Sequence, residues 1–306
     1  MKGEVRYNKD CIQRINMREY AMELTANAKI NLGLDVLRKR PDGYHDVRMV
    51  MQMTGMYDQI SLSPLKKPGI RFTVNLPYVP ANENNLAYRA AKLLMDEFGV
   101  TDGLSIRLSK FIPVAAGLAG GSTDAAAVLK GVNRLFGLGL SEEELMKRGK
   151  TIGADVPYCI MGGTALAEGI GEILTPLPDM PMCSILLAKP AISVSTKEVY
   201  GALRADAIEK HPDIDGMLDA LREGNLRGIT ERCSNVLEDV TAPQHPIIRA
   251  FEEEMKTGGA LASIMSGSGP TVFGIFDNYD AAGACRNEMR RKYPSAKIFL
   301  TSPVRR

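Results

Sequence analysis

Glycine residues gather at Gly117, Gly120 and Gly121, directly before a segment with helical periodicity. Apolar residues recur there at intervals of three and four, at Ala125, Val128, Leu129, Val132, Leu135 and Phe136. The first amides of a helix have no backbone partner and lie at the positive end of its dipole, so a glycine loop entering a helix can wrap an anion, most often phosphate. The segment therefore predicts a phosphate-binding loop. A glycine-rich turn that lets the helix pack closely on a strand is the alternative interpretation.

The spacing of these glycines excludes two common phosphate motifs. The sequence has no Gly-x-x-x-x-Gly-Lys-Ser/Thr, and its Gly-x-x-Gly-Gly differs from the dinucleotide motif Gly-x-Gly-x-x-Gly. Residues that favour the start of a helix follow the last glycine, at Ser122, Thr123 and Asp124. Gly137 is placed to end this helix.

Two charged residues could take part in phosphoryl transfer, Lys29 and Asp155. Lys29 lies beside Asn31 on the polar face of an alternating segment, 28–36, where it could supply positive charge to a phosphate or to a catalytic carboxylate. Asp155 precedes a valine and Pro157, which suits a helix N-cap, and an aspartate can also accept a hydroxyl proton during phosphoryl transfer. The structural alternatives are a solvated lysine on an outer face and an aspartate that only caps.

Two further segments could contact a ligand. Ser266–Thr271 is rich in glycine and lies between two apolar strands, so it is either a hairpin turn or a second place where backbone amides approach a ligand. Tyr44 and His45 follow an Asp42-Gly43 turn signal, and an aromatic ring beside an imidazole could hold a flat base. A purely structural Tyr-His pair is the alternative.

The remaining periodicity predicts the elements that must position these residues. Strands are expected at 28–36, 47–53, 57–62, 70–74, 104–108, 184–188, 261–265, 272–276 and 297–301, with a turn or short helix and then a strand within 154–169. Helices are expected at 84–98, 141–153, 197–208, 213–223 and 247–256, and before Tyr293. Because strands and helices mix without regular βαβ alternation, the pattern favours a two-domain α+β fold. Three prolines near residue 178 mark the connection, and we divide the chain into 1–172 and 173–306.

Length and composition narrow the possible classes of protein. A chain of 306 residues accommodates two domains with substantial cores. A net charge of +2 and the absence of tryptophan give no case for binding nucleic acid or an anionic membrane surface. The five cysteines show no metal-ligand spacing and indicate free thiols in a reducing compartment. Residues 1–20 are charged and do not form a signal peptide, and we interpret them as an extension or an edge strand. A cytoplasmic protein is expected.

Taken in order, these segments resemble the GHMP kinases, which include galactokinase, homoserine kinase and mevalonate kinase. Three segments match the three motifs of that superfamily: Ala28–Leu32, Pro113–Ala126 and Ser266–Thr271. Two others, Pro41–His45 and Gly153–Pro157, are typical of the branch that acts on a cytidine-diphosphate-linked methylerythritol. The similarity runs from about residue 23 to the end of the chain. It implies a ribosomal S5-like N-terminal domain and a ferredoxin-like C-terminal domain, with the active site in the cleft between them.

The resemblance also implies the reaction, the ligands and the site. ATP, with Mg²⁺, phosphorylates the 2-hydroxyl of 4-diphosphocytidyl-2-C-methyl-D-erythritol, a step of isoprenoid biosynthesis, in a monomer or weak homodimer. Asp155 accepts the hydroxyl proton, and Lys29 tunes that carboxylate and stabilises charge. The implied ATP site comprises Asn85, Leu86, Lys110, Pro113, Ala116, Gly117, Leu118, Ala119, Gly120, Gly121, Ser122, Thr123 and Asp124. The implied substrate site comprises Asn31, Tyr44, His45, Thr196, Tyr200, Gly267, Ser268 and Gly269. The resemblance assigns no metal ligands.

The sequence departs from the family pattern mainly in the glycine loop. Ala115, Ala116 and Ala119 stand where glycine is frequent, and each adds a methyl group where the backbone nears phosphate. Two alternatives remain open: a kinase of the homoserine or mevalonate type, and a non-catalytic homologue that only binds a ligand. Tyr44 and His45 argue against the first, because those substrates carry no flat base. The pairing of Lys29 with Asp155 argues against the second.

Overall fold

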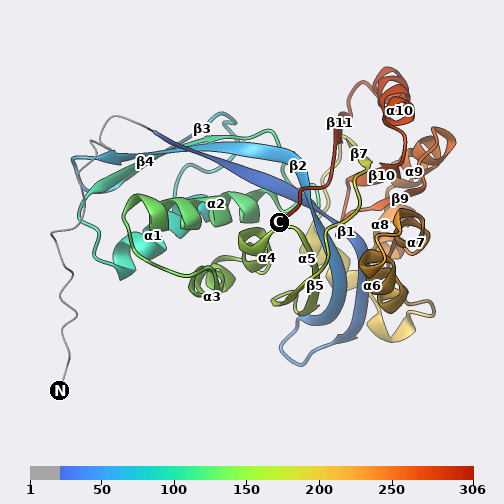
Figure 1. Cartoon of the computed structure of the whole chain (residues 1–306), viewed down its shortest axis with the longest axis horizontal. Helices are drawn as coiled ribbons and strands as arrows, with labels where there is room; N and C mark the ends of the chain where they lie inside the picture. The colour runs from blue at the N-terminus through green and yellow to red at the C-terminus, as the bar shows by residue number, and fades with distance from the viewer. Residues whose placement is uncertain (1–20) are drawn as a thin grey trace.

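The computed structural model describes residues 21–306, so the prediction for residues 1–20 lies outside the described part of the chain. The first half is built on a sheet whose main strand order is β3-β4-β2-β1-β8, with β5 and β6 continuing from β2 (Figure 1). Its strands are β1 (Met22–Lys39), β2 (His45–Leu65), β3 (Ile70–Val74), β4 (Gly103–Ser109), β5 (Thr164–Gly169), β6 (Ile173–Pro176) and β8 (Ser234–Asn235). Most pairs are antiparallel, as expected for an α+β fold.

The long hairpin of β1 and β2 forms the centre of this sheet. The turn between them contains Gly43 at φ +88°, a conformation that glycine adopts readily. The prediction of separate strands at 47–53 and 57–62 is wrong, because β2 runs unbroken through both segments and includes Pro64. Proline is accommodated there because β1 begins at Met22, opposite Leu62, so β2 has a single partner strand at Pro64.

Four helices cover one face of the first sheet (Figure 1). They are α1 (Leu86–Glu97), α2 (Gly120–Leu135), α3 (Glu142–Ile152) and α4 (Val156–Met161). The central helix, α2, lies directly on the β1–β2 hairpin, where a Cβ added at Gly131 would lie 2.4 Å from Leu62 and 2.5 Å from Leu24. A glycine at this position therefore sets the close distance between the helix and the sheet, which fixes where the start of α2 lies.

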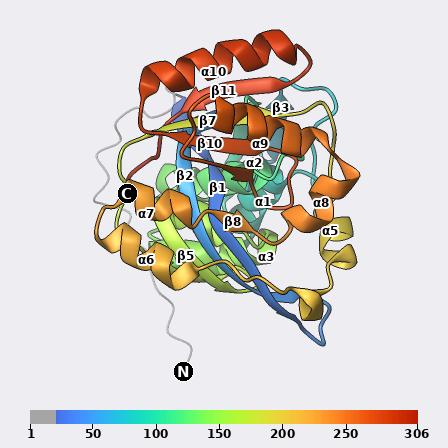
Figure 2. The same ribbon diagram turned by 90° about the vertical axis from the view of Figure 1, so that its right-hand side faces the viewer.

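The second half contains a four-stranded antiparallel sheet of order β11-β7-β10-β9. Its strands are β7 (Ser184–Lys189), β9 (Ala262–Met265), β10 (Val272–Phe276) and β11 (Lys297–Thr301). Helices α9 (Ile247–Thr257) and α10 (Tyr279–Lys292) lie over it (Figure 2). All four strands and α9 agree with the sequence predictions to within two residues, and α10 ends at Lys292, as predicted for a helix ending near Tyr293.

The connecting region of the second half was predicted less well. The helix expected at 197–208 is interrupted, forming α5 (Thr196–Ala202) and a 3₁₀ turn at Ala205–Ala207. The helix expected at 213–223 is α6 (Ile214–Arg222), whereas the sequence analysis missed α7 (Leu226–Glu231), β8 and α8 (Glu238–Gln244). These elements are only two to seven residues long, and so short a segment carries little periodicity.

The two halves share strands and hydrogen bonds. Strand β8 pairs in parallel with β1 at Gly33 and Leu34, and Val304 near the C-terminus donates its amide to Met53 of β2 at 2.8 Å. Strand β6, just after the proposed boundary at 172/173, pairs with β5 of the first sheet. That boundary remains a proposal. None of the helices in residues 21–306 combines the length and the apolarity that crossing a bilayer requires.

Candidate active site

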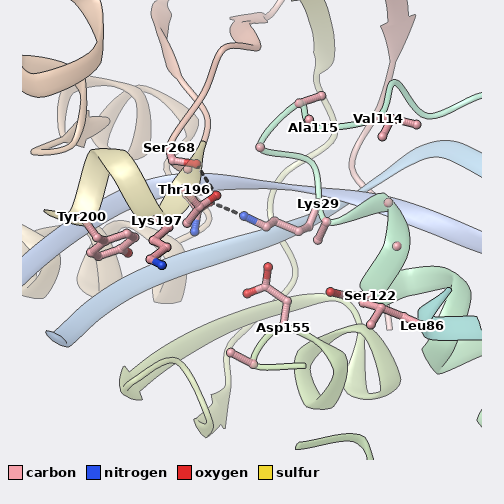
Figure 3. A pocket seen from close by; sticks show the side chains of 18 of the residues that line it. Lys29, Leu86, Val114, Ala115, Ser122, Asp155, Thr196, Lys197, Tyr200 and Ser268 are labelled. Atoms are coloured by element: carbon pink, nitrogen blue, oxygen red, sulfur yellow. Dashed lines mark hydrogen bonds between the residues drawn. The ribbon is translucent and has the colours of Figure 1, made fainter. Parts of the chain in front are cut away.

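A cavity of about 950 Å³ lies where the glycine loop, β1, the start of α4 and α5 meet (Figure 3). Its wall includes residues from both glycine-rich segments, from the Tyr44–His45 turn and from the start of α1. Segments that are more than 200 residues apart in the sequence therefore line one cavity.

The glycine loop approaches α2 in a left-handed conformation at three residues. Ala115, Gly117 and Ala119 have φ of 51°, 76° and 56°. Two of these are alanines at positions where the family often has glycine, so the loop keeps the glycine-like backbone at the cost of strain, about 1–2 kcal/mol per residue. Ala115 and Ala119 therefore hold a conformation that glycine would adopt without this strain.

The helix after this loop begins at Gly120, not among Ser122, Thr123 and Asp124 as predicted from capping preferences. Ala119 is the N-cap, and no side chain caps the helix. The first amides of a helix have no partner within it, so here they remain available to a ligand. An uncapped helix start beside a cavity suits phosphate.

The second glycine-rich segment is a hairpin turn, as one of its two interpretations predicted, and whether its amides approach a ligand stays a prediction. It forms the turn of the β9–β10 hairpin, and it packs against the first loop. Ser266 Oγ donates to Gly117 O at 3.1 Å, and the amide of Thr271 donates to Ala116 O at 3.3 Å. A Cβ added at Gly117 would lie 2.2 Å from Ser266 O, so the contact requires glycine.

Lys29 is buried, with 5% of its surface exposed, so the interpretation of a solvated lysine is wrong. The opposite, apolar face of β1, with Ile30 and Leu32, packs into a core shared with the second sheet, and the polar face turns into the cavity. Irregularities in the β1–β2 register occur just before Lys29 and just after Asn31, where bulges can aim side chains. Lys29 Nζ donates to Asn31 Oδ1 at 2.5 Å.

Asp155 occupies the N-cap position of α4, as its sequence context predicts, but its side chain makes no capping hydrogen bond. The carboxylate is directed into the cavity beside Lys29, with Ser122 on the other side (Figure 3). An aspartate that is held in place by the backbone and whose oxygens are not used by the helix can accept a proton from a bound hydroxyl.

Lys110, a residue of the implied ATP site, lies in the cavity wall with its side chain buried. It is paired with two buried carboxylates: Nζ donates to Asp124 Oδ2 at 2.8 Å and to Asp58 Oδ2. Asp58 Oδ1 accepts from the amides of Phe111 and Ile112 at 2.5 and 2.8 Å. The cluster therefore joins β2, the segment that leads into the glycine loop, and α2.

Aromatic rings gather at the other end of the cavity. The rings of His45 and Tyr200 lie 5.3 Å apart with an interplanar angle of 41°, and Tyr44 beside them is exposed. Burial, with a smaller contribution from Lys39, lowers the pKa of His45, which keeps its ring neutral. His45 Nε2 is buried and has no hydrogen-bond partner among the described residues. A neutral ring with one unsatisfied nitrogen can exchange a hydrogen bond with a polar ligand.

Most of the predicted site residues line the cavity: Lys29, Asn31, Tyr44, His45, Asn85, Leu86, Lys110, Pro113, Ala116, Gly117, Ala119, Gly120, Gly121, Ser122, Asp124, Asp155, Thr196, Tyr200, Gly267 and Ser268. Three others do not. Leu118 and Thr123 are buried, with 1% and 2% of their surfaces exposed, because the turn of the loop and of α2 directs them into the protein. Gly269 packs against Met265 instead. The side chains of Leu118 and Thr123 are therefore not available to a ligand.

Sequence reasoning missed two residues that hold the site together. Asp58 alternates with Ile60 and Leu62 on a buried face, and an acid on an apolar face was the available signal. The side-chain amide of Asn235 donates to Met265 O and Gly267 O, both at 2.8 Å, and so holds the second glycine segment from β8. Its partners lie about 30 residues away in the sequence, so no local pattern could reveal it.

Comparison with known proteins agrees with this geometry. The model of the GHMP kinases N terminal domain matches residues 85–163, and that of the GHMP kinases C terminal domain matches residues 217–295. The chain is 51% identical over 281 residues to the 4-diphosphocytidyl-2-C-methyl-D-erythritol kinase of Lachnospira eligens, covering 92% of this chain and 98% of the relative. It is 52% identical over 250 residues to the enzyme of the same name from Bacillus subtilis, covering 82% and 86%.

Solved structures show the same architecture. A crystal structure of a 4-(cytidine 5′-diphospho)-2C-methyl-D-erythritol kinase superposes with a TM-score of 0.79 at 32% identity, covering 92% of this chain and 99% of the other. The homoserine kinase of Cytophaga hutchinsonii superposes with a TM-score of 0.73 at 18% identity, covering 92% and 94%, and this likeness shows the fold alone. The family and fold predicted from the sequence motifs are thereby confirmed.

Proposed function

The chain belongs to the GHMP kinases, and from this premise we propose that it transfers the γ-phosphoryl group of ATP to the 2-hydroxyl of 4-diphosphocytidyl-2-C-methyl-D-erythritol. It is an ATP-dependent small-molecule kinase. Relatives about half identical over nine tenths of the chain carry this activity in their names. We place the reaction in the cytoplasm.

One observation carries the proposal: Lys29 and Asp155, from different elements, meet in the same cavity as an uncapped helix start. Phosphoryl transfer needs positioning and charge stabilisation more than covalent chemistry. In our proposal the Asp155 carboxylate accepts the proton of the attacking hydroxyl. Lys29, oriented by Asn31, stabilises the negative charge that develops between the hydroxyl and the phosphate.

The residues around the glycine loop fit the phosphates of ATP. The first turn of α2 presents amides without intrahelical partners, and a Cβ added at Gly121 would contact only Leu86, at 3.7 Å, so the backbone there is open to a ligand. Residues 21–306 contain no group of three or more His, Cys, Asp or Glu side chains arranged for a metal. We therefore expect Mg²⁺ to arrive with ATP and to be held mainly by its phosphates, as is usual for this ion.

The aromatic end of the cavity supports a substrate with a flat base. In the proposal, cytosine lies against Tyr44 and Tyr200, and His45 Nε2 satisfies a polar atom of its edge. Homoserine and mevalonate have no ring that could stack here and present a polar edge atom to this nitrogen. An enzyme discriminates strongly against a substrate that would leave a buried polar group of its site unpaired.

The test is an assay of ADP release by the purified protein with Mg²⁺, ATP and the cytidine-diphosphate substrate. We expect turnover with this substrate and none with homoserine or mevalonate, and a faster rate with either would refute the proposal. Asp155→Asn should lower kcat by roughly 10²- to 10⁴-fold without changing stability, because the side chain makes no cap bond. Asp102→Asn, an exposed acid outside the cavity wall, is the matched control.

A further inference from the structure

The buried cluster of Asp58, Lys110 and Asp124 has an unbalanced charge. Asp58 is fully buried, and the other two side chains are 4% and 3% exposed. Two carboxyl groups share one ammonium, so with both carboxyls ionised the cluster would carry a net negative charge in the protein interior. An uncompensated buried charge is strongly unfavourable.

The two carboxyl groups are not equivalent. Asp58 is fully hydrogen-bonded, since its Oδ1 accepts two backbone amides and its Oδ2 accepts from Lys110. Asp124 accepts from Lys110 through Oδ2 only, and its Oδ1 is buried with no partner among the described residues. Asp124, through this Oδ1, is therefore the carboxyl group that can hold a proton.

The cluster lies against the expected phosphate site. Asp124 and Lys110 both contribute to the cavity wall, and a Cβ added at Gly120, the first residue of α2, would lie 3.1 Å from Lys110 Nζ. The amides of Phe111 and Ile112, which lead into the loop, are held by Asp58. The same three side chains thus fix both ends of the loop on which phosphate is expected to lie.

We propose that the Asp58–Lys110–Asp124 cluster positions the glycine loop for ATP and takes up a proton on Asp124 when the nucleotide phosphates bind. The inference rests on the proposed function, because it needs the triphosphate on this loop. Binding adds several negative charges close to a cluster that is already unbalanced. Protonation of Asp124 leaves one carboxylate paired with one ammonium, and this neutral pair no longer repels the phosphates.

The groups around Asp124 agree with this assignment. Burial raises the pKa of Asp124 to about 8; Lys110 opposes this shift and Asp58 adds to it. On α4 the thiol of Cys159 also faces Asp124, and burial raises its pKa too, so it stays neutral. The proposed catalytic pair contributes one charge of each sign. Lys110 is thus the cation beside Asp124, and its ammonium is already shared between Asp58 and Asp124.

The test is isothermal titration calorimetry of the whole protein with Mg²⁺ and ATPγS, without the alcohol substrate, near pH 8 in two buffers of different ionisation enthalpy. The thiophosphate is fully ionised at this pH, so proton exchange reports on the protein. Binding of the phosphates should increase the protonated fraction of Asp124, which predicts a net uptake of less than one proton per ATPγS bound. Asp124→Asn should still bind ATPγS but without proton uptake.

Two further variants complete the design. Asp58→Asn also removes the net negative charge of the cluster and should abolish the proton uptake. This variant tests the inference if Asp124→Asn fails to fold. Asp96→Asn breaks an exposed pair with Lys92 and should leave the uptake unchanged. If the wild-type protein binds ATPγS without proton uptake, or if uptake persists in Asp124→Asn, this inference is overturned and the proposed function is not. Absence of ATPγS binding by the wild-type protein contradicts the proposed function as well.

Discussion

The contact between the two glycine-rich segments can be tested by Gly117→Ala. The substitution places a methyl group 2.2 Å from the carbonyl oxygen of Ser266 and 3.1 Å from that of Gly269. Both neighbours are backbone atoms, so no side-chain rotation relieves the clash and the loops must separate. Gly117 also has φ +76°, where a Cβ is itself unfavourable.

The expected cost has two parts. The left-handed conformation costs an alanine about 1–2 kcal/mol. Separation of the loops breaks the Ser266 Oγ to Gly117 O and Thr271 N to Ala116 O hydrogen bonds, at about 1 kcal/mol each. Gly117→Ala should therefore lower the free energy of unfolding by about 3–4 kcal/mol and should also reduce turnover, because both loops face the cavity.

A matched control separates the two parts. Gly99 has φ +59°, and a Cβ added there meets nothing within 4 Å, so Gly99→Ala incurs the backbone cost alone. The assay is urea denaturation of both variants, together with kcat for ADP release. If the two variants lost the same stability, or if Gly117→Ala kept wild-type turnover, the claim that the two loops must touch would be refuted.

Two other predictions follow from strain and from burial. Ala119→Gly removes a methyl group at φ 56° and should raise the free energy of unfolding by up to about 1 kcal/mol, measured by urea denaturation; a loss of stability would contradict the strain. Burial, reinforced by Glu238 and opposed by Arg249, raises the pKa of Glu252 to about 8 from an unfolded value near 4.5. Its contribution to stability is therefore complete below pH 4.5 and is lost as the pH rises through 8. Glu252→Gln should flatten the decline of the unfolding free energy over that range by at most about 1.4 kcal/mol per pH unit, and an unchanged slope would exclude the shift.

The sequence predicted those parts of the site that depend on local pattern. Alternation along β1 placed Lys29 and Asn31 on one face, and the proline after Asp155 marked a helix start. Both depend on the period of a strand or on a capping preference, which a few neighbouring residues encode. The places of these candidate residues on their elements could therefore be predicted before the three-dimensional arrangement of the site.

The parts of the site that could not be predicted from the sequence depend on contacts between distant segments. Nothing near Lys110 in the sequence indicates that its ammonium pairs with Asp58, 52 residues earlier. The start of α2 was predicted at Ser122 to Asp124 because these residues are good caps. The helix instead begins at Gly120 without a side-chain cap, and the loop before it is hydrogen-bonded to Ser266 through Gly117 O.

The shared strands determine how ligands can enter the cavity. Strand β8 is hydrogen-bonded to β1 beside the residues that carry the proposed chemistry, and the C-terminal segment is bonded to β2 through Gly55 and Val304. Enzymes that close two lobes over a substrate need a hinge where few bonds cross. Here hydrogen bonds join the two halves both at β8 and at the C-terminal segment. We therefore expect substrate and product to pass by movement of exposed loops at the cavity rim, such as those carrying Tyr78 and Val114. The rate of product release would then depend on these loops rather than on a reorientation of domains.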